Sequence, residues 1–111
     1  MGGNGHAGDG LMLVLCTFPD LEAARRIGSA LVSGGLAACV NLVPKVESMY
    51  LWKGEMQTEN EVLAIFKIVA GGFAEFEQGL LGMHPYEVPE ILGIEADAVN
   101  AGYLGWALGG N

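Results

Sequence analysis

The fold depends most on the stretch Leu36-Ala37-Ala38-Cys39-Val40-Asn41-Leu42-Val43-Pro44-Lys45-Val46-Glu47-Ser48-Met49-Tyr50-Leu51-Trp52. Side chains alternate on both sides of Pro44, which predicts one long strand, and the proline marks a bulge or kink because it has no N–H to donate within a ladder. Lys53-Gly54-Glu55 predicts a turn, and residues 60–69 predict the partner strand. Together they predict a β-hairpin longer than a domain of 111 residues normally requires.

Shorter elements flank this hairpin. The apolar run at residues 11–17 predicts a strand that is buried on both faces. A helix should follow, with Asp20 as its N-cap and with Gly34-Gly35 at its end, since glycine readily adopts the left-handed conformation. Apolar residues at helical spacing predict a second helix over residues 73–83, and residues 91–94 predict a short strand.

A last helix is expected through Val99, Tyr103 and Trp106, capped by Asp97 or Asn100. The order of elements is then β-α-β-β-α-β with a terminal helix, which is the ferredoxin-like arrangement of the α+β class. The helices must cover one face of an antiparallel sheet. The other face and the hairpin would expose apolar residues, so we expect a second subunit to cover them and the hairpin to act as an interlocking arm.

The N-terminal end differs in composition from the rest. Residues 1–10 are rich in glycine, which predicts a disordered tail ahead of a single domain over residues 11–111. The tail has no basic or apolar segment and is not a signal peptide. We therefore expect a reducing, cytoplasmic location in which both cysteines are free thiols.

The charge balance excludes some partners. A net charge of −8 argues against nucleic acid and against an anionic membrane surface, because both attract basic proteins. No apolar run reaches the roughly 18 to 20 residues that a membrane span needs. The acidity suits the attraction of cations.

Four short blocks of sequence, taken in their order along the chain, resemble the pattern of a known family. They are Ala37-Ala38-Cys39-Val40-Asn41, Tyr50-x-Trp52-Lys53-Gly54-Glu55, His84-Pro85-Tyr86-x-Val88-Pro89-Glu90-Ile91 and Tyr103-Leu104-x-Trp106. Over residues 11–108 the chain resembles the CutA divalent-cation-tolerance family. The resemblance implies a ferredoxin-like fold with a long bent hairpin, and a homotrimer similar to that of the PII signalling proteins. It also implies a role in tolerance of copper and other divalent metal ions, and it implies no enzymatic reaction.

The resemblance further implies a metal site built from cysteine, histidine and carboxylates. The matching candidates are Cys16, Cys39, His84 and Glu90. A soft thiolate and an imidazole suit copper or zinc. The two cysteines do not form a C-x-x-C pair, and each also fits the description of a small buried hydrophobe.

His84 should end the second helix, where the dipole favours a protonated ring. Its alternative role is a structural cap that is hydrogen-bonded to a carbonyl of the last turn. Glu87 and Glu90 are not identified as a catalytic pair, and a solvated surface is the favoured interpretation of both.

Several further residues are candidates for a ligand cleft or for a subunit interface, namely Tyr50, Trp52, Lys67, Tyr86 and Trp106. Aromatic rings with polar groups can line a cleft, although such residues more often belong to a core or an interface. Lys67 would suit an anion.

Three functions compete at this point. The first is a trimeric protein that binds copper or zinc. The second is a PII-like sensor that binds a small organic ligand at clefts between subunits. The third is an enzyme with a cleft near His84, Tyr86 and Glu90. The sequence contains no nucleotide-binding or nucleophile motif, and we expect a protein without enzymatic activity.

Overall fold

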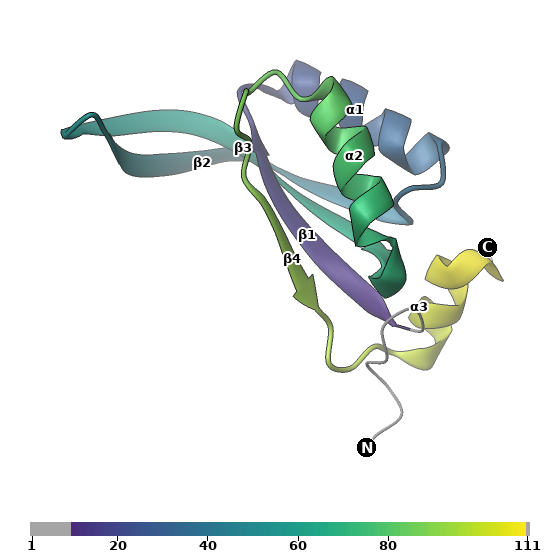
Figure 1. Ribbon diagram of the computed structural model, residues 1–111. Coiled ribbons are helices and arrows are strands. Elements are labelled where there is room, and N and C mark those ends of the chain that lie inside the picture. The colour runs from purple at the N-terminus through teal and green to yellow at the C-terminus, as the bar shows by residue number, and fades with distance from the viewer. Residues whose placement is uncertain (1–9, 111) are drawn as a thin grey trace.

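The computed structural model describes residues 10–110, which form one antiparallel sheet and two main helices (Figure 1). The elements are β1 (Leu11–Phe18), α1 (Leu21–Ser33), β2 (Cys39–Trp52), β3 (Glu55–Val69), a 3-10 turn (Ala70–Gly72), α2 (Phe73–Met83), β4 (Ile91–Glu95), α3 (Ala101–Gly105) and a π-helical turn (Trp106–Gly110). No helix within this range is both long and apolar enough to cross a membrane.

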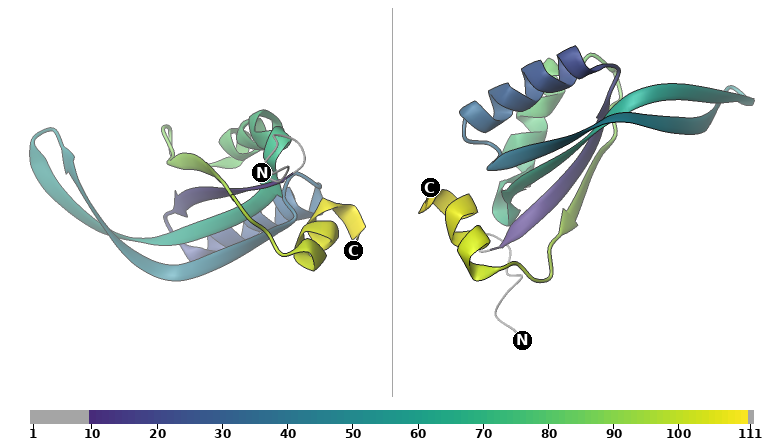
Figure 2. Two further views of the ribbon diagram at one scale, coloured as in Figure 1. Left: turned by 90° about the horizontal axis from the view of Figure 1, so that it is seen from below. Right: turned by 180° about the vertical axis from the view of Figure 1, so that it is seen from behind.

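The sheet has the strand order β2-β3-β1-β4, and every neighbouring pair is antiparallel. Helices α1 and α2 lie together on one side of it, while the β2–β3 hairpin projects beyond the body of the molecule (Figures 1 and 2). The ferredoxin-like α+β fold with its long bent hairpin, expected from the order of elements, is thereby confirmed.

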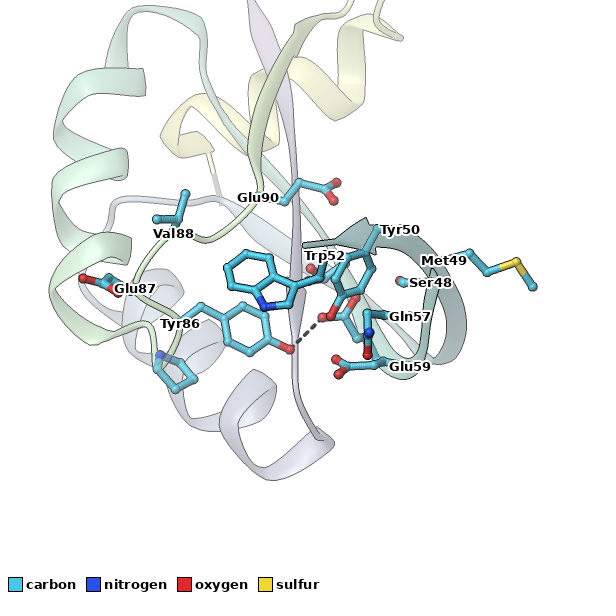
Figure 3. Close-up of a pocket in the computed structure, with 13 residues that line it drawn as sticks. Ser48, Met49, Tyr50, Trp52, Gln57, Glu59, Tyr86, Glu87, Val88 and Glu90 are labelled. Atoms are coloured by element: carbon cyan, nitrogen blue, oxygen red, sulfur yellow. Dashed lines mark hydrogen bonds between the residues drawn. The ribbon is translucent and has the colours of Figure 1, made fainter. Parts of the chain in front are cut away.

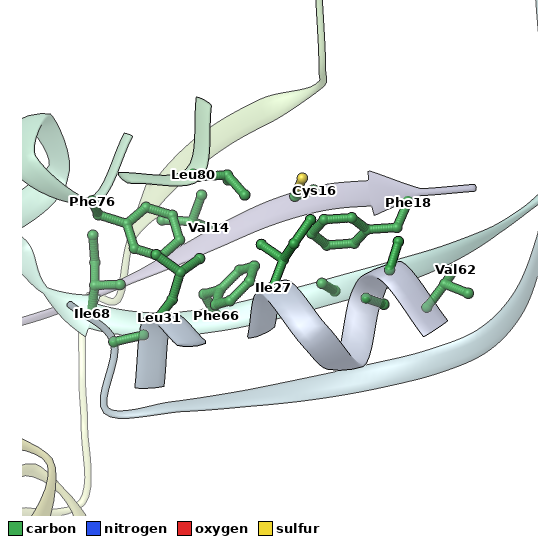
Figure 4. Packing of buried hydrophobic residues seen from close by; sticks show 14 residues of the cluster. Val14, Cys16, Phe18, Ile27, Leu31, Val62, Phe66, Ile68, Phe76 and Leu80 are labelled. Carbon is green, nitrogen blue, oxygen red and sulfur yellow. The ribbon is translucent and has the colours of Figure 1, made fainter. Parts of the chain in front are cut away.

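The core fills the space between the sheet and the two helices (Figure 4). Alternate residues of β1 and β3 point into it, because successive side chains of a strand face opposite sides of the sheet. Its largest fully buried side chains are Val14, Cys16, Phe18, Ile27, Leu31, Phe66, Ile68, Phe76 and Leu80. The rings of Phe66 and Phe76 meet edge to face at 4.9 Å between centroids, which joins β3 to α2.

Both ends of α1 are set by local sequence. The Asp20 Oδ1 accepts a 2.8 Å hydrogen bond from the Ala23 N–H, as an N-cap should. At the other end Gly35 has a φ of 81°, and the N–H of Leu36 donates to the carbonyl of Leu31. This left-handed termination at glycine is the one that the sequence predicted.

The hairpin contains the predicted bulge and turn. Its register shifts between Val43 and Val46, around Pro44. At the tip Lys53 and Gly54 both have positive φ, 53° and 80°, which makes a two-residue turn of the I′ type.

Two strand boundaries differ from the prediction by three residues or more. β3 starts at Glu55 and not at residue 60, because the tight turn places its polar first residues in register with β2. β2 starts at Cys39 and not at Leu36. The N–H groups of Leu36 and Ala37 donate to the end of α1 instead of to the sheet.

The face of the sheet away from α1 and α2 is apolar and only partly covered in the single chain. β1 and β4 place Leu13 opposite Ile94 and Leu15 opposite Leu92 on this face. At the hairpin tip Met49, Leu51, Trp52 and Met56 are each more than 60% exposed. The expectation of exposed apolar strands in the isolated chain is therefore correct.

The C-terminal end lies at one edge of this face. Of the two candidate caps for α3 it is Asn100 that serves, since its Oδ1 accepts from the Tyr103 N–H at 3.0 Å. Of the predicted tail, residues 1–9 lie outside the described residues. The carbonyl of Gly10, however, accepts a hydrogen bond from the N–H of Ala70.

Candidate functional site

The segment between α2 and β4, residues 84–90, is here called the connector, and it is anchored by His84. The backbone N–H of His84 caps α2 by donating to the Leu80 carbonyl at 2.9 Å. Its ring is buried and stacks on Phe18, with 4.7 Å between centroids and 13° between planes. The connector therefore starts from a fixed point on β1.

Both ring nitrogens of His84 have hydrogen-bond partners. The Tyr86 N–H donates to Nδ1 at 3.0 Å, so Nδ1 carries no proton. Nε2 lies 2.8 Å from the Thr17 carbonyl oxygen, which can only accept, so Nε2 carries the hydrogen. The imidazole is therefore held as a single neutral tautomer.

Burial lowers the pKa of His84, although the Thr17 carbonyl and Glu61 act in the opposite direction. The expectation that the end of α2 favours a protonated ring was therefore wrong. The ring is hydrogen-bonded to the Thr17 carbonyl and stacked on Phe18, and in this buried position desolvation is the largest influence on its pKa. The histidine does cap the helix, but through its backbone N–H.

Tyr86 ties the connector to the hairpin. Its hydroxyl donates a 2.6 Å hydrogen bond to Oε2 of Glu61 on β3. Burial, this hydrogen bond and the carboxylate charge together raise the pKa of the Tyr86 phenol. Tyr86 is thus fixed at two points, by its N–H on His84 and by its hydroxyl on Glu61.

An open cleft of about 1000 Å³ lies between the connector and one face of the hairpin (Figure 3). Its lining residues come from β1, β2, β3 and the connector, and they are Thr17, Ser48, Met49, Tyr50, Trp52, Gln57, Glu59, Glu61, Pro85, Tyr86, Glu87, Val88 and Glu90. The register pairs Ser48 with Glu59 and Tyr50 with Gln57. Polar and aromatic side chains therefore share this face of the hairpin.

The cleft is acidic and aromatic. Four of its lining residues are glutamates, three are aromatic, and none is lysine, arginine or histidine. Partial desolvation and the neighbouring Glu59 raise the pKa of the Tyr50 phenol. A cationic group would find several acceptors here and no competing cation among the lining residues.

The structure does not bring the four candidate metal ligands together within one chain. Cys16 lies in the core opposite Ala64, whereas Cys39 lies on the other face of the sheet opposite Lys67. The two positions are about 10 Å apart along the strands, at 3.3 Å per residue. Among residues 10–110, no three His, Cys, Asp or Glu side chains are grouped closely enough to hold a metal ion.

The environments of these four residues also differ. Burial, with smaller contributions from Glu90 and Glu61, raises the pKa of the Cys16 thiol to about 12, which disfavours the thiolate that a metal needs. Cys39 is half-buried, and its Sγ lies 3.5 Å from the Tyr103 hydroxyl. Glu90 is exposed and lines the cleft.

The residues expected to line a ligand cleft separate into two groups. Tyr50, Trp52 and Tyr86 do line the cleft. Lys67 instead lies beside Cys39, and the ring of Trp106 packs on Tyr103 at 5.6 Å near the C-terminal end. Those two positions do not contribute to the cleft.

Sequence reasoning missed two carboxylates of the cleft, Glu59 and Glu61. The signal was present in the spacing of Gln57, Glu59 and Glu61 at every second position, starting three residues after Gly54. Such alternation puts all three on one face of a strand.

Comparison with known proteins identifies the family. The family model described as CutA1 divalent ion tolerance protein matches residues 12–109. The divalent-cation tolerance protein CutA of Thermus thermophilus is 42% identical over 94 residues, covering 85% of this chain and 91% of the relative. Protein CutA of Mus musculus is 34% identical over 94% of this chain, and the chain spans 59% of that longer protein.

Solved structures agree with these relationships. The crystal structure of CutA1 from Oryza sativa superposes with a TM-score of 0.87 at 34% identity, covering 92% of this chain and 94% of that one. The Thermus thermophilus CutA1 structure gives a TM-score of 0.84 at 40% identity, covering 87% and 94%. The chain therefore belongs to the CutA1 divalent ion tolerance protein family.

Proposed function

We propose that this chain is a cytoplasmic divalent-cation tolerance protein that assembles as a homotrimer and binds copper or other divalent metal ions. The observation that carries the proposal is the family match over residues 12–109, together with relatives whose printed names describe divalent-cation tolerance. Those names describe no reaction, which supports a role without catalysis.

The trimer is supported by the surface that the single chain leaves uncovered. Leu92 and Ile94 on the open sheet face are about half exposed, and Trp52 at the hairpin tip is 62% exposed. Burying these residues against other copies would remove apolar surface from water and pair exposed strand edges.

Light scattering tests the assembly. The expected mass in solution is three times the 11.6 kDa of the chain. Trp52→Ala should weaken the trimer, so that it dissociates on dilution at a higher protein concentration than the wild type. The reason is that buried aromatic anchors contribute on the order of 2 kcal/mol or more to an interface. A monomeric mass at micromolar concentration would overturn the proposal.

The metal site is proposed to be shared between copies. Cys39 and Glu90 are the two candidate ligands that are not locked inside their own chain, one offering sulfur and the other oxygen. Cys16 would have to leave the core to bind an ion. His84 would have to break the two hydrogen bonds of its ring. We therefore assign both a structural role, Cys16 in packing the core and His84 in holding the connector.

Zinc titration of the reduced protein by calorimetry tests this division. Cys39→Ser and Glu90→Gln should each weaken zinc binding, since each removes a ligand atom or its charge. Cys16→Ala should lower the free energy of unfolding but leave zinc affinity unchanged. Equal loss of affinity in Cys16→Ala and Cys39→Ser, with both variants folded, would contradict the assignment.

A second candidate function is a PII-like sensor of a small organic ligand. The cleft beside the connector favours it, because about 1000 Å³ is at the upper end of the range typical of small-molecule sites. Its aromatic and carboxylate lining also supplies the mixture of apolar surface and fixed polar groups that such sites use.

A further inference from the structure

We propose that His84 is a pH-sensitive latch: a proton taken up at Nδ1 removes the acceptor for the Tyr86 N–H and releases the connector from β1, while the core stays folded. This device goes beyond the proposed role in metal tolerance. It depends on contacts inside one chain, so it does not require the cleft to be free in the assembly. The proposed metal ligands Cys39 and Glu90 are not among the partners of the ring, which are Thr17, Phe18 and Tyr86.

The ring has one place for an added proton. Nε2 already carries a hydrogen, which it donates to the Thr17 carbonyl at 2.8 Å. The added proton must therefore go to Nδ1, where the Tyr86 N–H points at 3.0 Å. An imidazolium donates from both nitrogens and accepts at neither, so two N–H groups would then face each other. Protonation thus replaces an attractive contact with a repulsive one at the start of the connector.

The surroundings of the ring favour its neutral, latched form at neutral pH. Burial lowers the pKa of His84 below the 6.5 of a free histidine, against the smaller effects of the Thr17 carbonyl and of Glu61 on β3. Glu61 is the charged side chain that acts on the ring. Burial also raises the pKa of the Cys16 thiol on β1 and of the Tyr86 phenol on the connector, so both stay neutral. Four other acids on the neighbouring segments do not contribute to the shift, namely Asp20 ahead of α1, Glu77 of α2, and Glu87 and Glu90 of the connector.

The rest of the connector is held loosely. Residues 85–90 lie outside the helices and the strands, and Val88 is 88% exposed. Besides its bonds to His84, the connector is tied to the hairpin by the Tyr86 hydroxyl, which donates to Glu61 at 2.6 Å. Segments with few buried contacts open at a lower free energy than the core does. Loss of the bond to Nδ1 should therefore open residues 85–90 and leave the sheet and both helices folded.

Hydrogen exchange of the full-length protein in its native assembly, followed by NMR from pH 7.5 to pH 5.0, tests the latch. Carboxylates largely keep their charge over this range. The protection factor of the Tyr86 N–H, corrected for the intrinsic exchange rate at each pH, should fall about 30-fold, because only the open form takes up the proton. The amides of β1, which lies between β3 and β4, should keep their protection. The ¹⁵N shifts of the His84 ring follow its protonation in the same samples.

Three variants separate the latch from other effects of acid. His84→Gln keeps a side-chain N–H and an acceptor oxygen but does not titrate, so the protection of the Tyr86 N–H should change less than about twofold over this range. Tyr86→Phe keeps the histidine but removes the tie to Glu61. A tenfold weaker latch should raise the pH at which half of the His84 rings are protonated by about one unit. Tyr103→Phe, which removes a hydroxyl on α3, is the matched control and should leave this pH unchanged.

Each outcome decides the proposal. It is supported if Tyr86 alone loses protection as the ring titrates, if His84→Gln abolishes this loss, and if Tyr86→Phe but not Tyr103→Phe shifts the titration upward. It is overturned if the ring takes up its proton while Tyr86 stays protected, or if the ring stays neutral at pH 5.0. A loss shared by β1, or an equal loss in His84→Gln, also overturns it.

Two further measurements keep the result independent of other failures. If His84→Gln does not fold, the two tyrosine variants supply the comparison by themselves. Light scattering at each pH follows the assembly, and zinc titration tests the metal role separately. A failure of the latch therefore leaves the proposed function standing, and the reverse also holds.

Discussion

The Nε2–H of His84 donates a 2.8 Å hydrogen bond to the carbonyl oxygen of Thr17. This bond fixes the start of the connector on the central strand β1, and the 2.6 Å bond from Tyr86 to Glu61 fixes its next turn on the hairpin. One wall of the cleft is therefore held in place by a histidine that belongs to the core. The stability of the fold and the shape of the cleft depend on the same side chain.

Replacing this histidine should destabilise the protein more than a surface substitution. His84→Ala removes a buried hydrogen bond and the stacking contact with Phe18, and it leaves a cavity. The expected loss is about 2–3 kcal/mol in the free energy of unfolding, measured with urea. His84→Gln, which retains a side-chain N–H, should recover part of the loss. A loss below about 0.5 kcal/mol in His84→Ala would show that the ring does not anchor the connector.

Stability should also depend on pH through the same residue. The pKa of His84 is lowered by burial below the 6.5 of a free histidine, so between the two pKa values the unfolded chain binds more protons. The free energy of unfolding should therefore fall as pH drops through 6.5, and this loss should be complete below the folded-state pKa.

Comparison of wild type with His84→Gln between pH 8 and pH 5.5 isolates this effect, since all other titrating groups are shared. The wild type should lose more stability than the variant over this range. Parallel pH profiles for the two proteins would contradict the burial-driven shift.

The tyrosine of the connector can be tested without changing its size. Tyr86→Phe removes the hydroxyl that donates to Glu61 and should lower the free energy of unfolding by about 1.5–3 kcal/mol, the usual range for a hydrogen bond to a charged group. Tyr103→Phe is the matched control, because among residues 10–110 its hydroxyl has a single side-chain partner, Cys39 Sγ at 3.5 Å. Urea unfolding of both variants checks the difference, and an equal loss in the two would argue against a strong Tyr86–Glu61 bond.

The parts of the fold that could be predicted from the sequence are those set by local signals. Asp20, Gly34-Gly35, Pro44 and Lys53-Gly54 each impose a backbone geometry of their own, and the structure has the expected cap, termination, bulge and turn at these places. The first third of β3 was missed because residues 55–59 are too polar to show a buried pattern. These residues form a strand because the turn at the tip aligns them with β2. This alignment depends on both strands together and cannot be seen in either segment alone.

The site is less predictable because it depends on register. The sequence indicates Tyr50, Trp52, Tyr86 and Glu90, which do line the cleft. It cannot show that Cys16 and Cys39 face opposite sides of the sheet, since that follows only once β2 is paired with β3 and β3 with β1. The direction of the His84 pKa shift likewise depends on contacts with Phe18 and Thr17 that are distant in sequence.

Two glycines of α2 give a contrast within one helix. A Cβ at position 82 would meet no atom within 4 Å, so Gly82→Ala should raise the free energy of unfolding by up to about 1 kcal/mol through helix propensity alone. A Cβ at position 79 would lie 2.8 Å from Leu36 Cδ1, so Gly79→Ala should gain little or lose stability. Thermal melts of both variants measure the difference. If Gly79→Ala stabilises the protein as much as Gly82→Ala does, the Leu36 side chain moves aside freely.

The last prediction concerns the reactivity of the buried thiol. In the Cys39→Ser variant Cys16 is the single remaining thiol, because the chain contains only two cysteines. Its pKa of about 12 leaves about one molecule in ten thousand as thiolate at pH 8, and its side chain is fully buried. Iodoacetamide should therefore modify the native variant only as fast as the chain opens, whereas the same variant in concentrated urea should react within minutes. Mass spectrometry of samples quenched over several hours follows both reactions. Rapid modification of the native variant would show that Cys16 is accessible, and it would return this residue to the set of metal ligands.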